Sequence, residues 1–111
     1  MLFPDHFLTV RATVTPEREA DFNRWYDTEH LPDAVRLFPG CIGGARFKAV
    51  LGDGSHQYMA MYAFPSAEKM AEALASPELK KLVAIYDADV GSFSTRQRTT
   101  YSKIGERMRD G

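Results

Sequence analysis

The segment at residues 57–64 limits the possible folds most, because it is apolar on both of its faces. One face consists of Tyr58, Ala60, Tyr62 and Phe64, and the other of Met59, Met61 and Ala63. A strand of this kind needs cover on both sides, so we expect it to lie inside a sheet rather than at its edge. A second strand is predicted at residues 6–14, where apolar residues alternate with mixed ones.

The first helix is bounded by prolines. Thr15 and Pro16 predict its start, with Thr15 as N-cap and Pro16 in the first helical position. Pro32 disfavours the α conformation in the residue before it, so we expect this helix to end near His30. One further turn is predicted at residues 33–37, before a Pro-Gly turn.

The complete order of elements predicts the fold class. Further strands are expected at residues 41–50 and 91–101, and a second helical region at residues 66–86 that is interrupted at Ser76. The order β-α-β-β-α-β is typical of an α+β, ferredoxin-like fold: a four-stranded antiparallel sheet with both helices on one face. We expect one domain over residues 1–111, with a flexible charged tail at 103–111.

The second face of this sheet has no helix to cover it. The pattern places Phe7, Arg11 and either Arg46 or Phe47 there, together with one set of side chains from residues 57–64. This mixture is too apolar to be left in water. We therefore expect a homodimer in which two such faces pack together.

Composition limits the function classes. The chain has 111 residues, 44% of them apolar, a formal charge of −1 and one cysteine. The charge balance does not favour binding to nucleic acid, and no apolar run is long enough to span a membrane. The N-terminal residues lack the basic and apolar regions of a secretory signal. We expect a cytoplasmic protein without a disulfide, and the three scattered histidines predict no metal site.

Chemistry is concentrated in residues 22–33, which combine aromatic rings, carboxylates and an imidazole. His30 is the leading candidate for acid–base catalysis, because an imidazole titrates near pH ~6.5; its alternative role is to cap the helix end. Tyr26 lies one turn earlier on the same face, and could assist His30 or simply belong to the core. We expect Trp25, Tyr26 and Tyr62 to line one cavity with His30. The helix dipole and burial act oppositely on the pKa of His30, so no direction is predicted.

Further candidates would bind a substrate. Trp25 is interpreted as packing or as a pocket wall, and Tyr62 as a core residue or as a hydroxyl donor in the pocket. Arg46 could clamp a carboxylate or pair with an acid at an interface, and Arg96 and Arg98 allow the same two roles. Glu29, like Asp33, could fix the tautomer of the histidine or face solvent. These roles remain open at the level of sequence.

Three short motifs indicate a family resemblance: WYDTEHLP at residues 25–32, FPG at 38–40 and YMAMY at 58–62. With the order of elements, they resemble the EthD-like group of the dimeric α/β-barrel superfamily, whose first helix ends in a His-x-Pro element before a Pro-Gly turn. The resemblance implies a pocket between helices and sheet, small aromatic or polyketide-like ligands and chemistry without a cofactor. The family's helix-end histidine corresponds to His30.

The function expected from these observations is a small cofactor-independent lyase, isomerase or cyclase acting on a small aromatic or carbonyl metabolite. His30 would be the general acid/base, and Tyr26 or Tyr62 would donate a hydrogen bond to the developing oxyanion. One alternative is a heme-handling or quinol-type monooxygenase, with His30 as a possible axial ligand of heme. Another is a non-enzymatic protein that binds a metabolite in the same pocket.

Overall fold

The computed structural model describes residues 3–109, so parts of the expected N-terminus and tail, residues 1–2 and 110–111, lie outside the described residues. The strands are β1 (His6–Val14), β2 (Gly43–Lys48), β3 (Tyr58–Phe64) and β4 (Ser94–Ser102). The helical elements are η1 (Pro16–Arg18), α1 (Glu19–Trp25), η2 (Tyr26–His30), α2 (Leu31–Leu37), α3 (Ala67–Leu74) and α4 (Pro77–Asp89). The predicted α+β, ferredoxin-like fold is confirmed.

The four strands form one antiparallel sheet in the order β2-β3-β1-β4. The expectation that residues 57–64 lie inside the sheet is confirmed, since β3 pairs with both β1 and β2. The register places Val10 of β1 opposite Ala60 of β3 on one side and opposite Arg98 of β4 on the other. Period-2 alternation then fixes which side chains share each face of the sheet.

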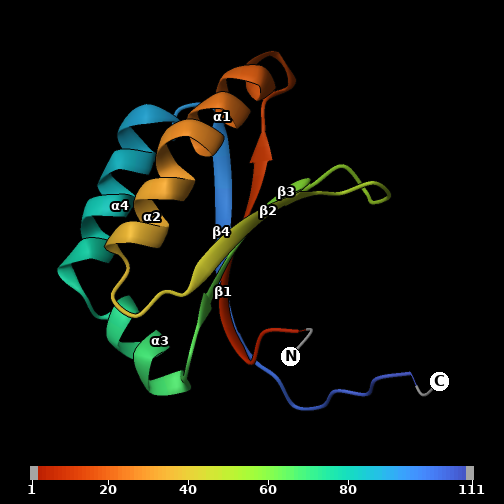
Figure 1. The fold of residues 1–111 in the computed structure, drawn as a ribbon. Coiled ribbons are helices and arrows are strands. Elements are labelled where there is room, and N and C mark those ends of the chain that lie inside the picture. The colour runs from red at the N-terminus through yellow and green to blue at the C-terminus, as the bar shows by residue number, and fades with distance from the viewer. Residues whose placement is uncertain (1–2, 110–111) are drawn as a thin grey trace.

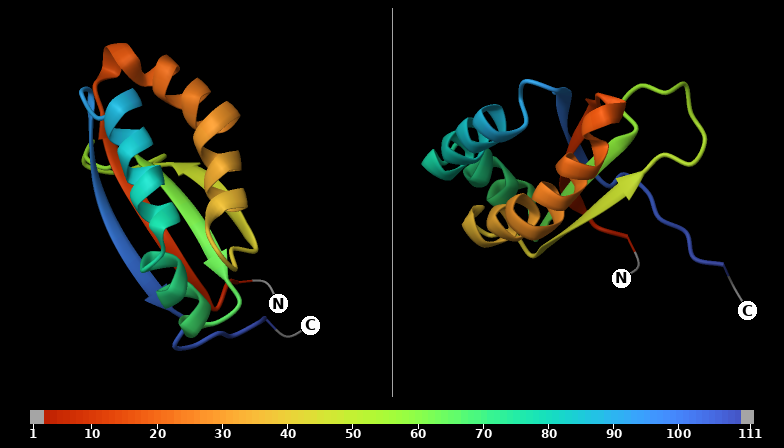
Figure 2. Two further views of the ribbon diagram at one scale, coloured as in Figure 1. Left: turned by 90° about the vertical axis from the view of Figure 1, so that its left-hand side faces the viewer. Right: turned by 90° about the horizontal axis from the view of Figure 1, so that it is seen from above.

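All helices cover one face of the sheet, while the β2–β3 loop and both ends of the chain lie on the other side (Figure 1). Seen from the helical side, α1 and α2 form one column and α3 and α4 a second one beside it (Figure 2). Ser66 caps α3 as predicted, with its hydroxyl oxygen accepting a hydrogen bond from the Lys69 N–H at 3.0 Å. The Thr15 hydroxyl instead donates to the carbonyl of Phe93, so the first helix starts without a side-chain cap.

The prediction that the first helix ends near His30 is wrong. The chain stays helical through Pro32, because residues Tyr26–His30 form a π-helical turn and α2 follows with Pro32 in its first turn. The N–H of Leu31 donates to the carbonyl of Tyr26, five residues earlier. This wider turn provides room for a proline ring that would collide with a carbonyl in a regular α-helix. Short π-helical turns of this kind are frequent at functional sites.

The helix-free face of the sheet, here called the open face, bears large side chains from all four strands. They are Phe7, Thr9 and Arg11 of β1, Phe47 of β2, Met59 and Met61 of β3, and Tyr101 of β4. Phe7 and Tyr101 stack with ring centroids 5.2 Å apart, and 47% of the Phe47 surface is exposed. It is therefore Phe47 that lies on this face, whereas Arg46 points toward the helices.

Beyond β4, residues 103–109 contain neither helix nor strand. Lys103 anchors the start of this segment through ion pairs with Asp5 at 2.8 Å and with Glu106 at 2.5 Å. No helix within residues 3–109 is long and apolar enough to cross a membrane.

Candidate functional site

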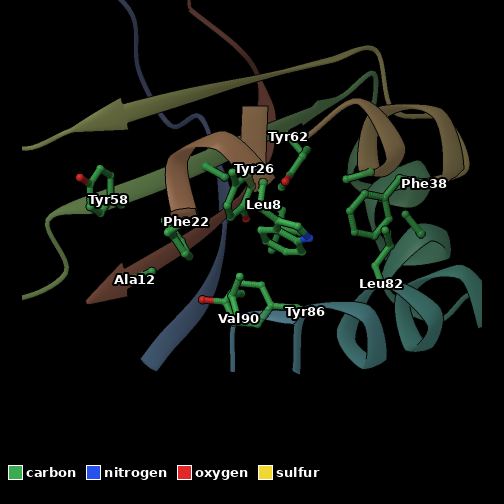
Figure 3. Close-up of a cluster of buried hydrophobic side chains, with 14 of the residues drawn as sticks. Leu8, Ala12, Phe22, Tyr26, Phe38, Tyr58, Tyr62, Leu82, Tyr86 and Val90 are labelled. Carbon is green, nitrogen blue, oxygen red and sulfur yellow. The ribbon is translucent and has the colours of Figure 1, made fainter. Parts of the chain in front are cut away.

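A cavity of about 40 Å³ lies between the helices and the sheet. Its polar lining consists of Tyr26, His30, Tyr62, Tyr86, Arg96 and Arg98, and the remaining lining residues are aliphatic except Phe38. Figure 3 shows the hydroxyls of Tyr62 and Tyr26 pointing into this cluster from β3 and η2, whereas Tyr86 of α4 lies along its lower side and directs its hydroxyl to Ser94. Since a single water needs ~10–15 Å³, the cavity offers room for the reactive end of a small molecule.

The π-helical turn brings Tyr26 and His30 to the same side of the chain. Their ring centroids are 5.1 Å apart and the rings meet edge to face. Both side chains are buried and both line the cavity, as expected from their i, i+4 spacing. The sequence thus places a phenol and an imidazole together at one wall of the cavity.

Trp25 does not belong to the cavity lining, although it contacts the site closely. Its indole stacks on the imidazole of His30, with ring centroids 4.5 Å apart and planes 17° from parallel. The indole N–H donates to a carboxylate oxygen of Asp89 on α4 at 2.8 Å. Trp25 therefore holds the orientation of His30 from behind, and Asp89 holds Trp25.

His30 is uncharged at neutral pH. Burial lowers the pKa of this imidazole from 6.5 to about 4, and the positive charge of Arg96 adds to the effect. Burial therefore outweighs the attraction from the nearby carboxylates of Asp33 and Asp89, which act in the opposite direction. Nδ1 is buried without a hydrogen-bond partner in the part of the chain that the structure describes.

The two carboxylates that could have fixed the tautomer of His30 do not bond to it. Glu29 is exposed to solvent, and Asp33 instead accepts a hydrogen bond from Arg36 at 3.0 Å. Both residues lie on the outer surface of the helical column, because only one side of the η2–α2 segment faces the sheet. Glu29 is therefore not placed to contact a molecule in the cavity.

Two buried phenols, Tyr26 and Tyr62, line the same cavity as the imidazole. The Tyr62 hydroxyl is buried without a partner at hydrogen-bond distance within residues 3–109, although the Tyr26 hydroxyl lies near enough to interact with it electrostatically. Burial raises the pKa of Tyr26 to about 12, although the neighbouring Tyr62 hydroxyl offsets part of this effect. Burial and the adjacent Tyr26 also raise the pKa of Tyr62 well above its usual value. Both groups stay protonated at neutral pH, so they can donate hydrogen bonds.

Arg46 lies outside the cavity, on the far side of Tyr26. Its guanidinium donates to Asp27 and to Asn23, each at 2.8 Å, and lies 4.6 Å from the centre of the Tyr26 ring. Only 13% of the Arg46 side chain is exposed. Its partners thus belong to the helix of the same chain, so Arg46 supports Tyr26 and does not face the cavity as a substrate clamp.

Two contributors to the site were not identified from the sequence. Tyr86 lines the cavity from α4, and its ring lies 6.0 Å from that of His30. Asp89 orients Trp25 through its hydrogen bond. The spacing of Leu79, Leu82, Val83 and Tyr86 is the helical signal that could have placed Tyr86 on the inner face of α4.

The arrangement does not fit a heme. His30 is the side chain that would ligate the iron, but the cavity that it lines has a volume of only about 40 Å³. Sites for ligands of drug size or larger occupy ~300–1,000 Å³. Among residues 3–109, no group of three or more metal-ligating side chains is gathered in one place.

Comparisons with known proteins establish the fold. No family model matches the chain, and no curated protein matches its sequence. Among solved structures, an ethyl tert-butyl ether D (EthD) family protein from Bacillus halodurans superimposes with a TM-score of 0.61, 20% identity, and coverage of 93% of this chain and 99% of its own. A candidate antibiotic biosynthesis monooxygenase from Deinococcus radiodurans gives a TM-score of 0.63 and 15% identity, covering 96% of this chain and 98% of its own.

A third similar structure is a mutant of SnoaB, a cofactor-independent oxygenase from Streptomyces nogalater. It has a TM-score of 0.58 and 20% identity, and covers 94% of this chain and 97% of its own. At these identities the similarity concerns the fold. The resemblance to the EthD-like group of dimeric α/β-barrel proteins is confirmed at that level.

Proposed function

We propose that this chain is a cofactor-independent enzyme in which His30 takes a proton from a small carbonyl compound. One observation carries this proposal: an uncharged, buried imidazole and an unpartnered, buried phenol face the same small cavity. Buried polar groups normally have hydrogen-bond partners, and leaving one unpaired costs ~1–3 kcal/mol. Two such groups beside one cavity are typical of a site whose partner is a bound molecule.

The chemistry follows from the two groups. An unprotonated imidazole nitrogen of His30 accepts a proton from the carbon next to a carbonyl, and the C–H electron pair forms the enolate double bond. The negative charge that develops on the carbonyl oxygen is stabilised by a hydrogen bond from Tyr62, whose raised pKa keeps it a donor. Return of the proton to another carbon gives an isomerase, and its transfer to a leaving group gives a lyase.

Trp25, Tyr26 and Arg46 act through His30 and the cavity wall. Trp25 fixes the plane of the imidazole, and Arg46 holds the ring of Tyr26 against it. Such support from neighbouring side chains keeps catalytic groups within the narrow range of productive geometry. The size of the cavity favours a small carbonyl group over an aromatic ring as the part of the substrate that enters.

A second candidate is a cofactor-independent oxygenation, supported by the name of the similar SnoaB protein. It would begin with the same proton removal by His30. The two are distinguished by oxygen consumption, since an isomerase or lyase consumes none.

Deuterium exchange tests the proposed function without knowledge of the natural substrate. Small carbonyl compounds with an acidic C–H, such as pyruvamide, are incubated in D₂O, and loss of the methyl signal is followed by proton NMR. The wild-type protein should accelerate exchange, and His30→Gln should lower the rate by ~10²-fold or more. His6→Gln, a histidine outside the cavity, serves as control. Exchange no faster than in buffer, or retained in His30→Gln, would contradict the proposal.

We also propose that the chain forms a homodimer through the open face. Within residues 3–109, no helix or strand covers the apolar stripe of Phe7, Met61, Phe47 and Tyr101. A second copy would present the same stripe, and the two would pack as sheets do in a sandwich.

A further inference from the structure

The charged side chains that line the cavity beside His30 are all positive. Its lining contains two guanidinium groups, Arg96 and Arg98, and no carboxylate among the described residues. Both arginines come from the helix-facing side of β4, two residues apart, as the pairing of Val10 with Arg98 and of Ala12 with Arg96 requires. The charge is therefore built into the edge strand of the sheet and directed toward the helices.

Of these two arginines, Arg96 is paired with an acid and Arg98 is not paired within residues 3–109. Arg96 pairs with Asp87 of α4 at 2.9 Å, and its guanidinium lies 4.0 Å from the centre of the Tyr86 ring. Arg98 makes no hydrogen bond or ion pair with any other residue in the range 3–109. Arg98 is also the one exposed residue in the lining of the cavity, so it lies at the rim. An unneutralised guanidinium at the mouth is suited to a carboxylate, which it can bind through two parallel hydrogen bonds.

We infer that the substrate is a small carboxylate, held at the rim by Arg98 so that its carbonyl end enters the cavity between Tyr62 and His30. This inference rests on the proposed function, because it names the substrate class of the same cavity. Three groups would then share one ligand. Arg98 binds the carboxylate, Tyr62 donates to the carbonyl oxygen, and His30 faces the carbon that loses its proton.

A pair of probes with the same shape and different charge tests this inference. Pyruvate carries a carboxylate where pyruvamide carries a neutral amide. Trp25 is the only tryptophan of the sequence and stacks on His30, so its fluorescence reports binding next to the site. The wild-type protein should bind pyruvate at least tenfold more tightly than pyruvamide, because hydrogen bonds between two charged groups are stronger than those to a neutral amide.

Variants distinguish a specific role of Arg98 from an effect of any nearby positive charge. Arg98→Gln should weaken pyruvate binding at least tenfold and change pyruvamide binding less than twofold. Arg98→Lys, which keeps the charge but loses the planar fork, should recover part of the affinity. Lys81→Gln removes one positive charge from the exposed side of α4, outside the cavity lining, and should leave both affinities unchanged. Circular dichroism confirms that each variant is folded.

Three results would overturn the inference: equal binding of the two probes, a preference for pyruvate that survives in Arg98→Gln, or phosphate binding as tightly as pyruvate with the same dependence on Arg98. The last result would make Arg98 a surface site for any anion. Failure here is separable from failure of the proposed function. If the protein shows no preference for a carboxylate, His30-dependent proton removal from pyruvamide would still support the proposed function. If the proposed function fails, His30→Gln should still bind pyruvate more tightly than pyruvamide, which would support the carboxylate site.

Discussion

Replacing His30 by phenylalanine should remove a specific part of the pH dependence of stability. The ring stacked on Trp25 is kept in this variant, but the titrating nitrogens are lost. In the wild-type protein the pKa of His30 lies at about 4 in the folded state and near 6.5 in the unfolded chain. Between these values the unfolded state binds more protons, so the stability is fully present above pH ~6.5 and is lost as the pH falls toward 4.

The size of the effect follows from the same two values. Each pH unit between them corresponds to ~1.4 kcal/mol, so the full loss is roughly 3.4 kcal/mol, and about 2.5 kcal/mol of it is reached at pH ~4.5. Carboxylates that titrate in this range do so in both proteins and cancel from the comparison. The wild-type protein should therefore lose about 2.5 kcal/mol more than His30→Phe between pH ~7.5 and pH ~4.5.

Urea denaturation followed by circular dichroism at the two pH values measures this difference, at one protein concentration throughout. His6→Gln, at the start of β1 and outside the cavity, is the matched control and should behave as the wild type. If His30→Phe and wild type lose the same free energy of unfolding, His30 is not held uncharged by burial.

Three further changes test other parts of the site and of the assembly. Tyr62→Phe removes an unpartnered buried hydroxyl, so urea denaturation should show a stability that is equal to that of the wild type or higher by up to ~1 kcal/mol. Proton exchange should be at least ~tenfold slower in this variant, and a large loss of stability would show that the hydroxyl has a partner. Arg46→Met removes the contacts to Asp27 and the Tyr26 ring, and should lower the free energy of unfolding by about 1–2 kcal/mol; an unchanged urea midpoint would refute this supporting role. Met61→Lys places a charge on the open face and should shift the sedimentation coefficient from dimer to monomer, whereas a wild-type protein that is already monomeric at micromolar concentration would contradict the dimer.

The strands β1 and β3 were predictable because each carries a period-2 pattern that no other element imitates. The limits of β1 at residues 6–14 agree with the prediction, and the apolar alternation of residues 57–64 correctly indicated an interior strand. Ser66 identified the start of α3 for a local reason, because a serine hydroxyl can satisfy a free N–H of the first turn. Such signals depend on a few neighbouring residues and are readable in one sequence.

The π-helical turn was not predictable by the same rules. Pro32 indicates the end of a regular helix, but the chain widens by one residue per turn instead and continues. The i, i+4 spacing still brought Tyr26 and His30 together, because both kinds of helix keep such residues close. The direction in which the pKa of His30 shifts could not be predicted, since it depends on how deeply tertiary packing buries the ring.

The residues predicted to bind a substrate lie in different places for a similar reason. Tyr62 lies in the cavity because β3 directs it to the helical side of the sheet. Arg46 shares that side, but its partners on the helix are far from it in the sequence and draw it behind Tyr26. Arg98 had the same pattern as Arg46 in the sequence, and only its neighbours in space distinguish the two.

The protonation of His30 is the most direct test of the central claim, that burial keeps the imidazole beside the cavity uncharged at neutral pH. With ¹⁵N-labelled histidine, NMR measures the charge and tautomer of each ring between pH ~3 and ~8, and His30→Gln identifies the signal. The signal of His30 should titrate near pH 4 and show a neutral ring at pH 7. A transition at or above pH 6.5 would contradict the claim, because the ring would then be solvated or paired with an acid.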